Sequence, residues 1–295
     1  MKNILQNKHI RASGKTFSLK DYKTDYRNGL KDEKLLRKEV EEYSNRIAAL
    51  QEALYAQGKY SVLVVLQAID GAGKDSCIKH VLSGVNPQGC EVTSFKQPSR
   101  EELDHDFIWR TYQRLPGRGK IGIFNRSYYE EVLITKVHRE LIPLQHIPGF
   151  ETVSQADRKF WKDRYRSINE MERHLVKNGT VIIKVFLNLS KKEQKNRFLE
   201  RISNPEKQWK FNYTDLEERK LWNKYQSAYE DMIRETSTKH APWYVVPADD
   251  QWISRALFGE LLLETLQSLD LSFPVLNAEE KKLVLKAKEE LEGEE

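Results

Sequence analysis

The sequence predicts an α/β protein in which helices cover both faces of a parallel sheet of about five strands. Short runs of Val, Ile and Leu, such as 62–66 and 181–183, alternate with longer segments of helical periodicity. Such apolar strands are typical of a parallel sheet buried on both faces. A glycine-rich turn ending in Gly73-Lys74 joins the first strand to a helix, as in a phosphate-binding loop. These observations predict one three-layer P-loop domain, for which 295 residues suffice.

The first half of the chain is expected to supply a helical extension and three strands. Residues 1–30 are polar and aperiodic, and are expected to wrap the surface. From Leu36 to Leu54 apolar residues recur every three or four positions, which predicts a long amphipathic helix. Asp32 is its expected N-cap and Gly58 its stop. There follow a strand at 61–67, a helix to about 82, a turn at 86–89, a strand at 91–95, a helix at 101–115 and a strand at 120–124.

The second half repeats the alternation. We expect a helix near 127, another over 156–177, a strand at 180–187, a helix broken at Asn204-Pro205, a helix over 215–235, a strand at 243–246 and a helix at 252–266. Ser190 and Glu193 predict a capping box. The expected units are an N-terminal extension (1–60), the P-loop domain (61–275, with a lid at about 190–214) and a charged C-terminal helix (276–295).

Composition indicates an ordinary globular protein. Hydrophobic residues make up 39% and charged residues 32% of the chain. The longest apolar runs fall far below the roughly 18 residues of a membrane span, and the N-terminus lacks the pattern of a secretory signal. Cys77 and Cys90 fit no metal-binding spacing. We expect a cytoplasmic location and no membrane partner.

The phosphate loop is the first candidate site. Backbone N–H groups of Gly71, Ala72 and Gly73, placed at a helix N-terminus, form an anion cradle, and Lys74 reaches the outer phosphates. Asp75 replaces the usual Ser/Thr, and Asp70 lies within the loop. Carboxylates beside phosphates repel them unless a metal bridges the two, so Mg²⁺ is implied, with Mn²⁺ as a substitute and Asp70 as its ligand. An ordinary glycine turn is the alternative interpretation.

The strand at 120–124 predicts a second candidate site at its C-terminal end, where open α/β sheets bind ligands. There the chain reads Asn125-Arg126-Ser127, followed closely by Glu130 and Glu131. Asn125 stands where P-loop proteins place a metal-orienting acid, and Arg126 is expected to face the transferring phosphoryl group. Alternatively this segment is a simple strand-to-helix turn whose acids favour the helix dipole.

A basic segment is the third candidate site. Residues 191–210 hold seven basic and three acidic side chains. Arg197 and Arg201, four positions apart, share one helix face, which favours an arginine-bearing lid that closes over phosphates. The alternative is a solvated basic helix.

Taken together, these motifs resemble the polyphosphate kinase 2 family. The stretches QAIDGAGKDSCIKHVLSGVNPQGC, GKIGIFNRSYYEEVLITKVH, FLNLSKKEQKNRFLERI and APWYVVPADD carry the resemblance, which covers roughly residues 15–275 and is strongest to the third class, acting on AMP and ADP. It implies a thymidylate-kinase-like P-loop kinase fold, Mg²⁺ and a polyphosphate donor. The residues it implies are Asp70, Lys74, Asn125 and Arg126 for catalysis, Ser127 and Glu130 for the nucleotide, and the loop 71–75, Lys79, Arg197 and Arg201 for polyphosphate.

The resemblance implies reversible transfer of the terminal phosphate of inorganic polyphosphate to AMP and ADP, giving ADP and ATP, by a homo-oligomer (dimer or tetramer). The chain reads GKDS where the family more often has GKGG or GKDG, which leaves the individual roles of Asp75 and Ser76 open. Two other functions fit the P-loop. One is an ATP-dependent nucleoside monophosphate kinase, and the other is a non-catalytic module that binds nucleotide or nucleic acid. The sequence lacks the aromatic-plus-basic pattern of single-strand binders, so no nucleic-acid partner is expected.

Overall fold

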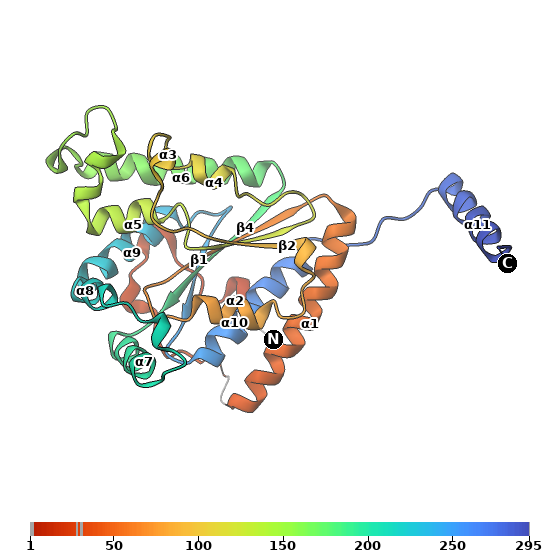
Figure 1. Cartoon of the computed structure of the whole chain (residues 1–295), viewed down its shortest axis with the longest axis horizontal. Coiled ribbons are helices and arrows are strands. Elements are labelled where there is room, and N and C mark those ends of the chain that lie inside the picture. Colours follow the sequence, from red (N-terminus) through yellow and green to blue (C-terminus); the bar gives the residue numbers. More distant parts are fainter. Residues whose placement is uncertain (1–2, 28, 30–31, 295) are drawn as a thin grey trace.

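A five-stranded parallel sheet forms the centre of the protein, as the sequence predicts (Figure 1). The structure, a computed structural model, describes residues 3–27, 29 and 32–294. The strand order is β2-β3-β1-β4-β5. The strands are β1 (Ser61–Gln67), β2 (Cys90–Ser94), β3 (Ile121–Asn125), β4 (Thr180–Asn188) and β5 (Trp243–Pro247). All seven residues of β1 are buried, because this strand lies in the middle of the sheet between two helical layers.

Helices cover both faces of the sheet (Figure 1). One layer contains α1, α2 and α10, which pack on one another, and the other contains α5, α6 and α9. Their bounds are α1 (Glu33–Gln57), α2 (Lys74–Val81), α10 (Gln251–Gln267), α5 (Glu130–Val137), α6 (Arg158–Lys177) and α9 (Trp222–Thr236). The chain therefore has the three-layer architecture that its alternation of strands and helices predicts.

The long helix α1 begins and ends where the sequence predicts. The Asp32 side chain accepts the backbone N–H of Lys34, and Gly58 closes the helix in the left-handed region, at φ 62°. Most of its periodic apolar residues, among them Leu36 and Leu54, are buried. Local sequence signals suffice here because the caps and the apolar stripe agree.

Two predicted helices are each divided in the structure. The segment 101–115 forms two short helices, α3 (Arg100–Leu103) and α4 (Trp109–Tyr112). The carboxylate of Asp106 accepts the backbone N–H of Ile108, which starts a new turn instead of continuing the first. The segment 215–235 is divided at Leu221 into α8 (Thr214–Lys220) and α9. α9 buries one face against the core, whereas α8 buries no residue.

The N-terminal segment is more deeply anchored than predicted. Ile4, Ile10 and Phe17 join the core, although the polar composition of residues 1–30 indicates a surface wrap. The backbone N–H of Ala12 donates to the carbonyl of Trp243, and Arg11 forms an antiparallel bridge with Tyr244. This segment covers the free edge of β5. It therefore contains apolar residues that pack on the core without the periodicity of a helix. Residues 1–2, 28 and 30 lie outside the described residues.

The C-terminal helix α11 (Ala278–Glu292) projects from the rest of the protein (Figure 1) and is exposed along its length. It is the mixed-charge surface helix that the sequence predicts. In the part of the chain that the structure describes, no helix is long and apolar enough to span a membrane.

Candidate active site

The candidate site lies at the carboxyl ends of β1 and β3, where the phosphate loop joins β1 to α2. Gly71 and Gly73 have φ values of 86° and 98°, a region that side chains with a Cβ rarely adopt. A Cβ on Gly71 would lie 3.2 Å from the ring of Phe198. The backbone path therefore requires both glycines, and the close approach of α7 (Lys191–Ser203) further disfavours a side chain at position 71.

Lys74 begins α2 and turns back toward the loop. Its Nζ donates to the backbone carbonyl of Ala68 at 2.8 Å, and the side chain is buried. Burial lowers the pKa of Lys74, and the nearby carboxylate of Asp70 opposes this shift. The ammonium group is thus held at the loop by one neutral acceptor and one negative charge.

Asp70 and Arg126 form an ion pair across the mouth of the site. The Asp70 Oδ1 and Arg126 Nη2 atoms are 2.6 Å apart, and the side chains are 37% and 38% exposed. Burial tends to raise the pKa of Asp70, but the positive charges of Lys74 and Arg126 outweigh it and hold that pKa below its ordinary value. The pair is therefore charged and still accessible to a ligand.

Arg126 has an unusual backbone. Its φ of 64° is left-handed, which is uncommon for a residue other than glycine. Its N–H donates to the carbonyl of Leu66 in β1, which fixes the turn that leaves β3. Backbone strain of this kind concentrates at functional sites because the surrounding structure must maintain it.

Asn125 links the end of β3 to the first turn of α2. Its Nδ2 donates to Oδ1 of Asp75 at 2.6 Å. Two of the positions where this chain departs from the usual P-loop pattern are therefore in direct contact. The neighbouring Ser76 has a different partner, because its hydroxyl accepts a hydrogen bond from Arg255 at 2.7 Å.

Ser127 and Glu130, the two residues expected at the nucleotide, have different environments. Ser127 is buried, and its hydroxyl accepts hydrogen bonds from Gln67 and from the N–H of Tyr129. It stabilises the turn rather than facing the site. Glu130 lies beside the loop charges: burial raises its pKa, while Arg126 and Lys74 act in the opposite direction. The next residue, Glu131, faces Arg164 instead, and burial raises its pKa to about 7.

The structure gives different environments to the three residues outside the loop that are expected to bind polyphosphate. Arg197 is buried behind the loop, with its guanidinium on backbone carbonyls, which differs from the expected place on the inner face of a lid. Arg201, one turn further along α7, is 25% exposed and 3.9 Å from Asp215. It also helps to lower the pKa of Asp70, so Arg201 lies on the side of α7 that faces the site. Lys79 is exposed on the second turn of α2.

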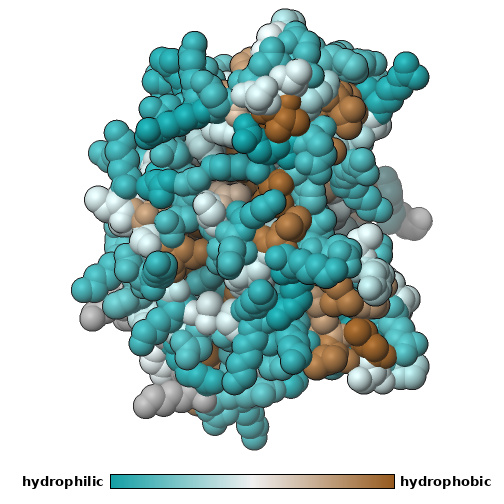
Figure 2. Space-filling model, turned by 90° about the vertical axis from the view of Figure 1, so that its left-hand side faces the viewer, coloured by the Kyte–Doolittle hydropathy of each residue, from teal (hydrophilic) through white to brown (hydrophobic). Residues whose placement is uncertain are grey.

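Sequence reasoning missed one wall of the site. A narrow cavity beside Asp70, Arg126 and Glu130 is also lined by residues of α7, α8 and α9: Gln194, Asp215, Glu218, Arg219, Tyr225 and Tyr229. Apart from Gln194, which lies in the stretch FLNLSKKEQKNRFLERI, these residues belong to no motif, and only the spacing of the two tyrosines, which share a helix face, indicates a common surface. The face of the molecule that includes these helices is mostly hydrophilic (Figure 2), as suits a charged substrate.

A second, more open cavity of about 390 Å³ lies elsewhere, between α6 and the residues that precede β5. His240, which lines it, comes before β5 and so lies toward the amino ends of the strands. The phosphate loop is at the carboxyl ends, and we therefore do not assign this cavity to the same site.

The residues at the loop fit a hard divalent cation that shares its coordination with phosphate. Among the residues described, no group of three or more His, Cys, Asp and Glu side chains could hold a metal ion alone. Asp70, Asp75 and Asn125 nevertheless place carboxylate and amide oxygens at the loop. Mg²⁺ is commonly bound in this way, by one or two carboxylates together with substrate phosphates.

The fold and this site define a P-loop protein of the kinase type, with the phosphate loop, a paired arginine and metal-compatible oxygens at one edge of a parallel sheet. The chain belongs to the polyphosphate kinase 2 (PPK2) family, whose model matches residues 30–273. Helix α11 lies beyond the matched residues.

Named relatives and a solved structure resemble most of the chain. An ADP-polyphosphate phosphotransferase of Rhodopseudomonas palustris is 51% identical over 87% of this chain and 86% of its own. An AMP/ADP-polyphosphate phosphotransferase of Meiothermus ruber is 47% identical over 82% of this chain and 85% of its own. The crystal structure of polyphosphate kinase 2 from Arthrobacter aurescens has a TM-score of 0.84 and 38% identity, covering 94% of this chain and 95% of that one.

Proposed function

We propose that the protein transfers the terminal phosphate of inorganic polyphosphate to AMP and to ADP, forming ADP and ATP. The observation that carries this proposal is the accessible Asp70–Arg126 pair beside Lys74 and the phosphate loop. Relatives of 51% and 47% identity carry the names of polyphosphate phosphotransferases, one for ADP and one for AMP and ADP. Which nucleotides this chain phosphorylates, AMP and ADP or one of them alone, is therefore the more specific part of the proposal.

The residues of the site divide the work between binding and charge stabilisation. The N–H groups of the loop bind the terminal phosphates of the donor, and Lys74 neutralises their outer oxygens. Arg126 stabilises the charge on the phosphoryl group during transfer. The attacking oxygen of a nucleotide phosphate is already anionic at pH 7, so the site needs no strong general base. Exchange of one phosphoanhydride for another makes the reaction readily reversible.

Asp70 is the proposed ligand for Mg²⁺, or for Mn²⁺ in its place, with the Asn125–Asp75 pair beside it. The ion, when bound, neutralises charge on the donor and acceptor phosphates. The low pKa of Asp70 keeps its carboxylate charged and ready to bind a cation at neutral pH. We also propose a cytoplasmic location, where the nucleotides are found, and a homo-oligomeric enzyme.

The test is a donor-defined assay with purified protein, Mg²⁺ and AMP. With polyphosphate and no ATP, we expect ADP to form first and ATP later, each followed separately. ATP as the sole donor is the control for a nucleoside monophosphate kinase. Transfer from ATP but not from polyphosphate would contradict the proposal, and nucleotide binding without product would indicate a binding module.

A further inference from the structure

Helix α7 contacts the back of the phosphate loop through three consecutive backbone carbonyls. The Gln194 side-chain amide donates to the carbonyl of Asp70 at 2.8 Å. One nitrogen of Arg197 donates to the carbonyls of Gly71 and Ala72, each at 3.0 Å. Both donor side chains are buried, at 1% and 5% exposure.

The direction of these carbonyls determines the direction of the loop N–H groups. In a planar trans peptide the C=O of one residue and the N–H of the next point in opposite directions. Carbonyls of residues 70–72 that face α7 therefore turn the N–H groups of residues 71–73 away from it. Among them, the N–H of Ala72 donates to the carbonyl of Ile69 within the loop, and those of Gly71 and Gly73 are the groups expected to bind phosphate.

We propose that Gln194 and Arg197 are positioning residues, which hold the loop so that its N–H groups face the phosphate. This inference rests on the proposed function, because it assigns a role within the same site. It replaces the expected role of Arg197 as a residue that contacts polyphosphate.

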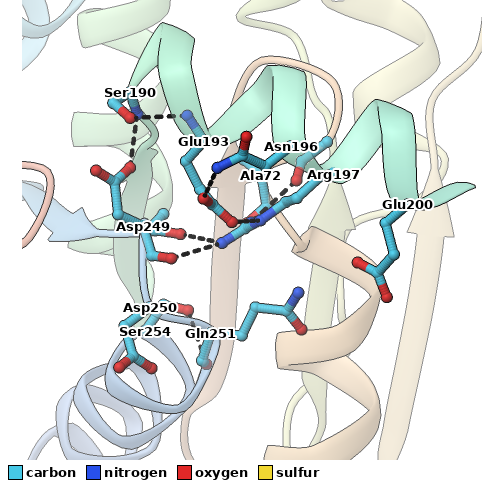
Figure 3. A network of polar contacts seen from close by, with 12 residues as sticks. Ala72, Ser190, Glu193, Asn196, Arg197, Glu200, Asp249, Asp250, Gln251 and Ser254 are labelled. Atoms are coloured by element: carbon cyan, nitrogen blue, oxygen red, sulfur yellow. Dashed lines mark hydrogen bonds and ion pairs between the residues drawn. The ribbon is translucent and has the colours of Figure 1, made fainter.

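The hydrogen bonds of Arg197 leave its guanidinium no donor for a phosphate. A guanidinium has five N–H donors, and Arg197 makes five hydrogen bonds (Figure 3). Besides the two to the loop, two go to the carbonyls of Ala248 and Asp249, and one goes to Glu193. Ala248 and Asp249 connect β5 to α10, so Arg197 links the phosphate loop to the segment that follows the carboxyl end of β5.

Gln194 is fixed from its other side. Its side-chain oxygen accepts a hydrogen bond from Arg219 of α8 at 2.6 Å, which leaves the amide nitrogen to face the carbonyl of Asp70. The start of α7 is also anchored, because the Ser190 hydroxyl caps the helix and the Ser190 N–H donates to Asp249. Glu193 is committed to Arg197, so the predicted capping box forms only its Ser190 half.

The test compares Arg197→Lys and Gln194→Leu with Lys195→Ala, a charge-removing control at an exposed position of the same helix. Two measurements are combined. Hydrogen exchange is followed by mass spectrometry in the loop (69–76), in β1 and in α6. Initial rates are measured with AMP and with ADP over a range of polyphosphate concentrations at two ionic strengths.

We expect faster exchange in the loop of both variants, with exchange in β1 and α6 unchanged. kcat should fall about 10- to 100-fold with either acceptor, as for a small misplacement of a catalytic group. KM for polyphosphate and its dependence on salt should stay close to those of the wild type. Lys195→Ala should match the wild type in exchange and in kcat.

Three results would overturn the inference. A raised KM for polyphosphate with a weakened salt dependence would show that Arg197 binds the donor directly. Faster exchange throughout the protein would show that both side chains merely support packing. Unchanged exchange in the loop would show that they do not hold it. If the wild type transfers no phosphate, the proposed function fails, but the exchange pattern still decides the positioning role.

Discussion

Two ion pairs of almost equal length perform different tasks in this protein. Lys184 and Glu172 are 2.7 Å apart and have no exposed side-chain surface. Asp70 and Arg126 are 2.6 Å apart, and each is more than one-third exposed. The distances are alike, so the difference lies in what surrounds each pair.

We call the buried Lys184–Glu172 pair the sealed pair and the partly exposed Asp70–Arg126 pair the open pair. The sealed pair has no hydrogen-bonding group left for a ligand. Lys184 Nζ donates to Glu172, to the hydroxyl of Tyr129 and to the carbonyl of Thr236. The other oxygen of Glu172 accepts the hydroxyls of Tyr128 and Tyr129. A fully satisfied buried network of this kind specifies one packing arrangement and cannot take a ligand without breaking.

One residue of the open pair, Arg126, lies on the same chain segment as the tyrosines that contact the sealed pair. Arg126 precedes Tyr128 by two residues, so the sealed pair holds the segment that presents Arg126 to Asp70. The comparison teaches that burial, rather than pair distance, separates a structural ion pair from one available for chemistry. The following predictions test that distinction.

The largest effect is expected from opening the sealed pair. Glu172→Ala leaves the buried ammonium of Lys184 without its counter-charge, and breaking a buried pair in this way costs about 3–5 kcal/mol of stability. Chemical denaturation measures the loss. Glu172→Gln, which keeps an acceptor for the tyrosines, should lose less. Equal stability of Glu172→Ala and the wild type would contradict a structural role for the network.

At the open pair, the expected effect is on the reaction rate rather than on stability. Lys74→Ala should fold normally and lose about 10²–10³ in kcat, the typical cost of one electrostatic contact at a transferring group. Rates with AMP and polyphosphate, together with thermal denaturation, measure both quantities. Retention of more than about a tenth of the activity, far above the residual activity expected, would place the lysine away from the reacting phosphate.

The Glu131–Arg164 pair is intermediate, since its side chains are 8% and 16% exposed. Burial raises the pKa of Glu131 from about 4.5 to about 7. The folded protein therefore binds this proton more tightly than the unfolded chain does. The stability that Glu131 contributes is present below about pH 4.5 and is lost as the pH rises through about 7.

The variant Glu131→Gln should weaken that pH dependence. Relative to the wild type, its melting temperature should improve steadily from pH 4.5 to about pH 7 and then level off, because a neutral amide has no charge to bury. Other groups with raised pKa values, among them Glu130, Glu260 and His138, will leave a residual slope. A constant difference between variant and wild type across this range would show that Glu131 does not titrate there.

A smaller and selective effect is expected at Glu130, which shares the electrostatic environment of the open pair. Glu130→Asn should depress phosphorylation of AMP more than that of ADP. We expect the ratio of kcat/KM values to change by about tenfold, the size of one charge-assisted hydrogen bond. Both acceptors are assayed with the same enzyme preparation. Equal losses would reduce Glu130 to a residue that merely begins α5.

How much of the molecule the sequence could predict depends on how far apart in the chain the residues of each signal lie. Strand β1, the loop and α1 have caps, glycines and periodic residues close together in the chain, and they were predicted almost to the residue. The clustering of Asp70, Lys74 and Arg126 follows from the parallel sheet, because its carboxyl ends meet at one edge.

The environment of Arg197 could not be predicted in this way. Its four carbonyl partners come from the loop and from the β5–α10 connection, which are distant in sequence, and backbone acceptors carry no sequence signature. From sequence alone Arg197 and Arg201 look equivalent, since both lie on one face of a basic helix. Only the packing of α7 against the loop buries one and leaves the other partly exposed.

The smallest effect is expected from Arg201, and it sharpens the comparison between open and sealed charges within one helix. Arg201→Ala removes a partly exposed cation that lies near Asp70. We expect KM for polyphosphate to rise about three- to tenfold, equivalent to one modest hydrogen bond, with the binding of AMP alone unchanged. Since the variant has one phosphate contact fewer for salt to screen, its KM should depend less on ionic strength than that of the wild type.

Initial rates at several polyphosphate concentrations and two ionic strengths measure both effects, and Lys195→Ala again serves as the matched loss of charge. If Arg201→Ala and Lys195→Ala behave alike, the accessible face of α7 is a solvated basic face. If only Arg201→Ala loses affinity, α7 has two functions divided by burial. Its buried face then shapes the phosphate loop, and its exposed arginine binds the phosphate chain.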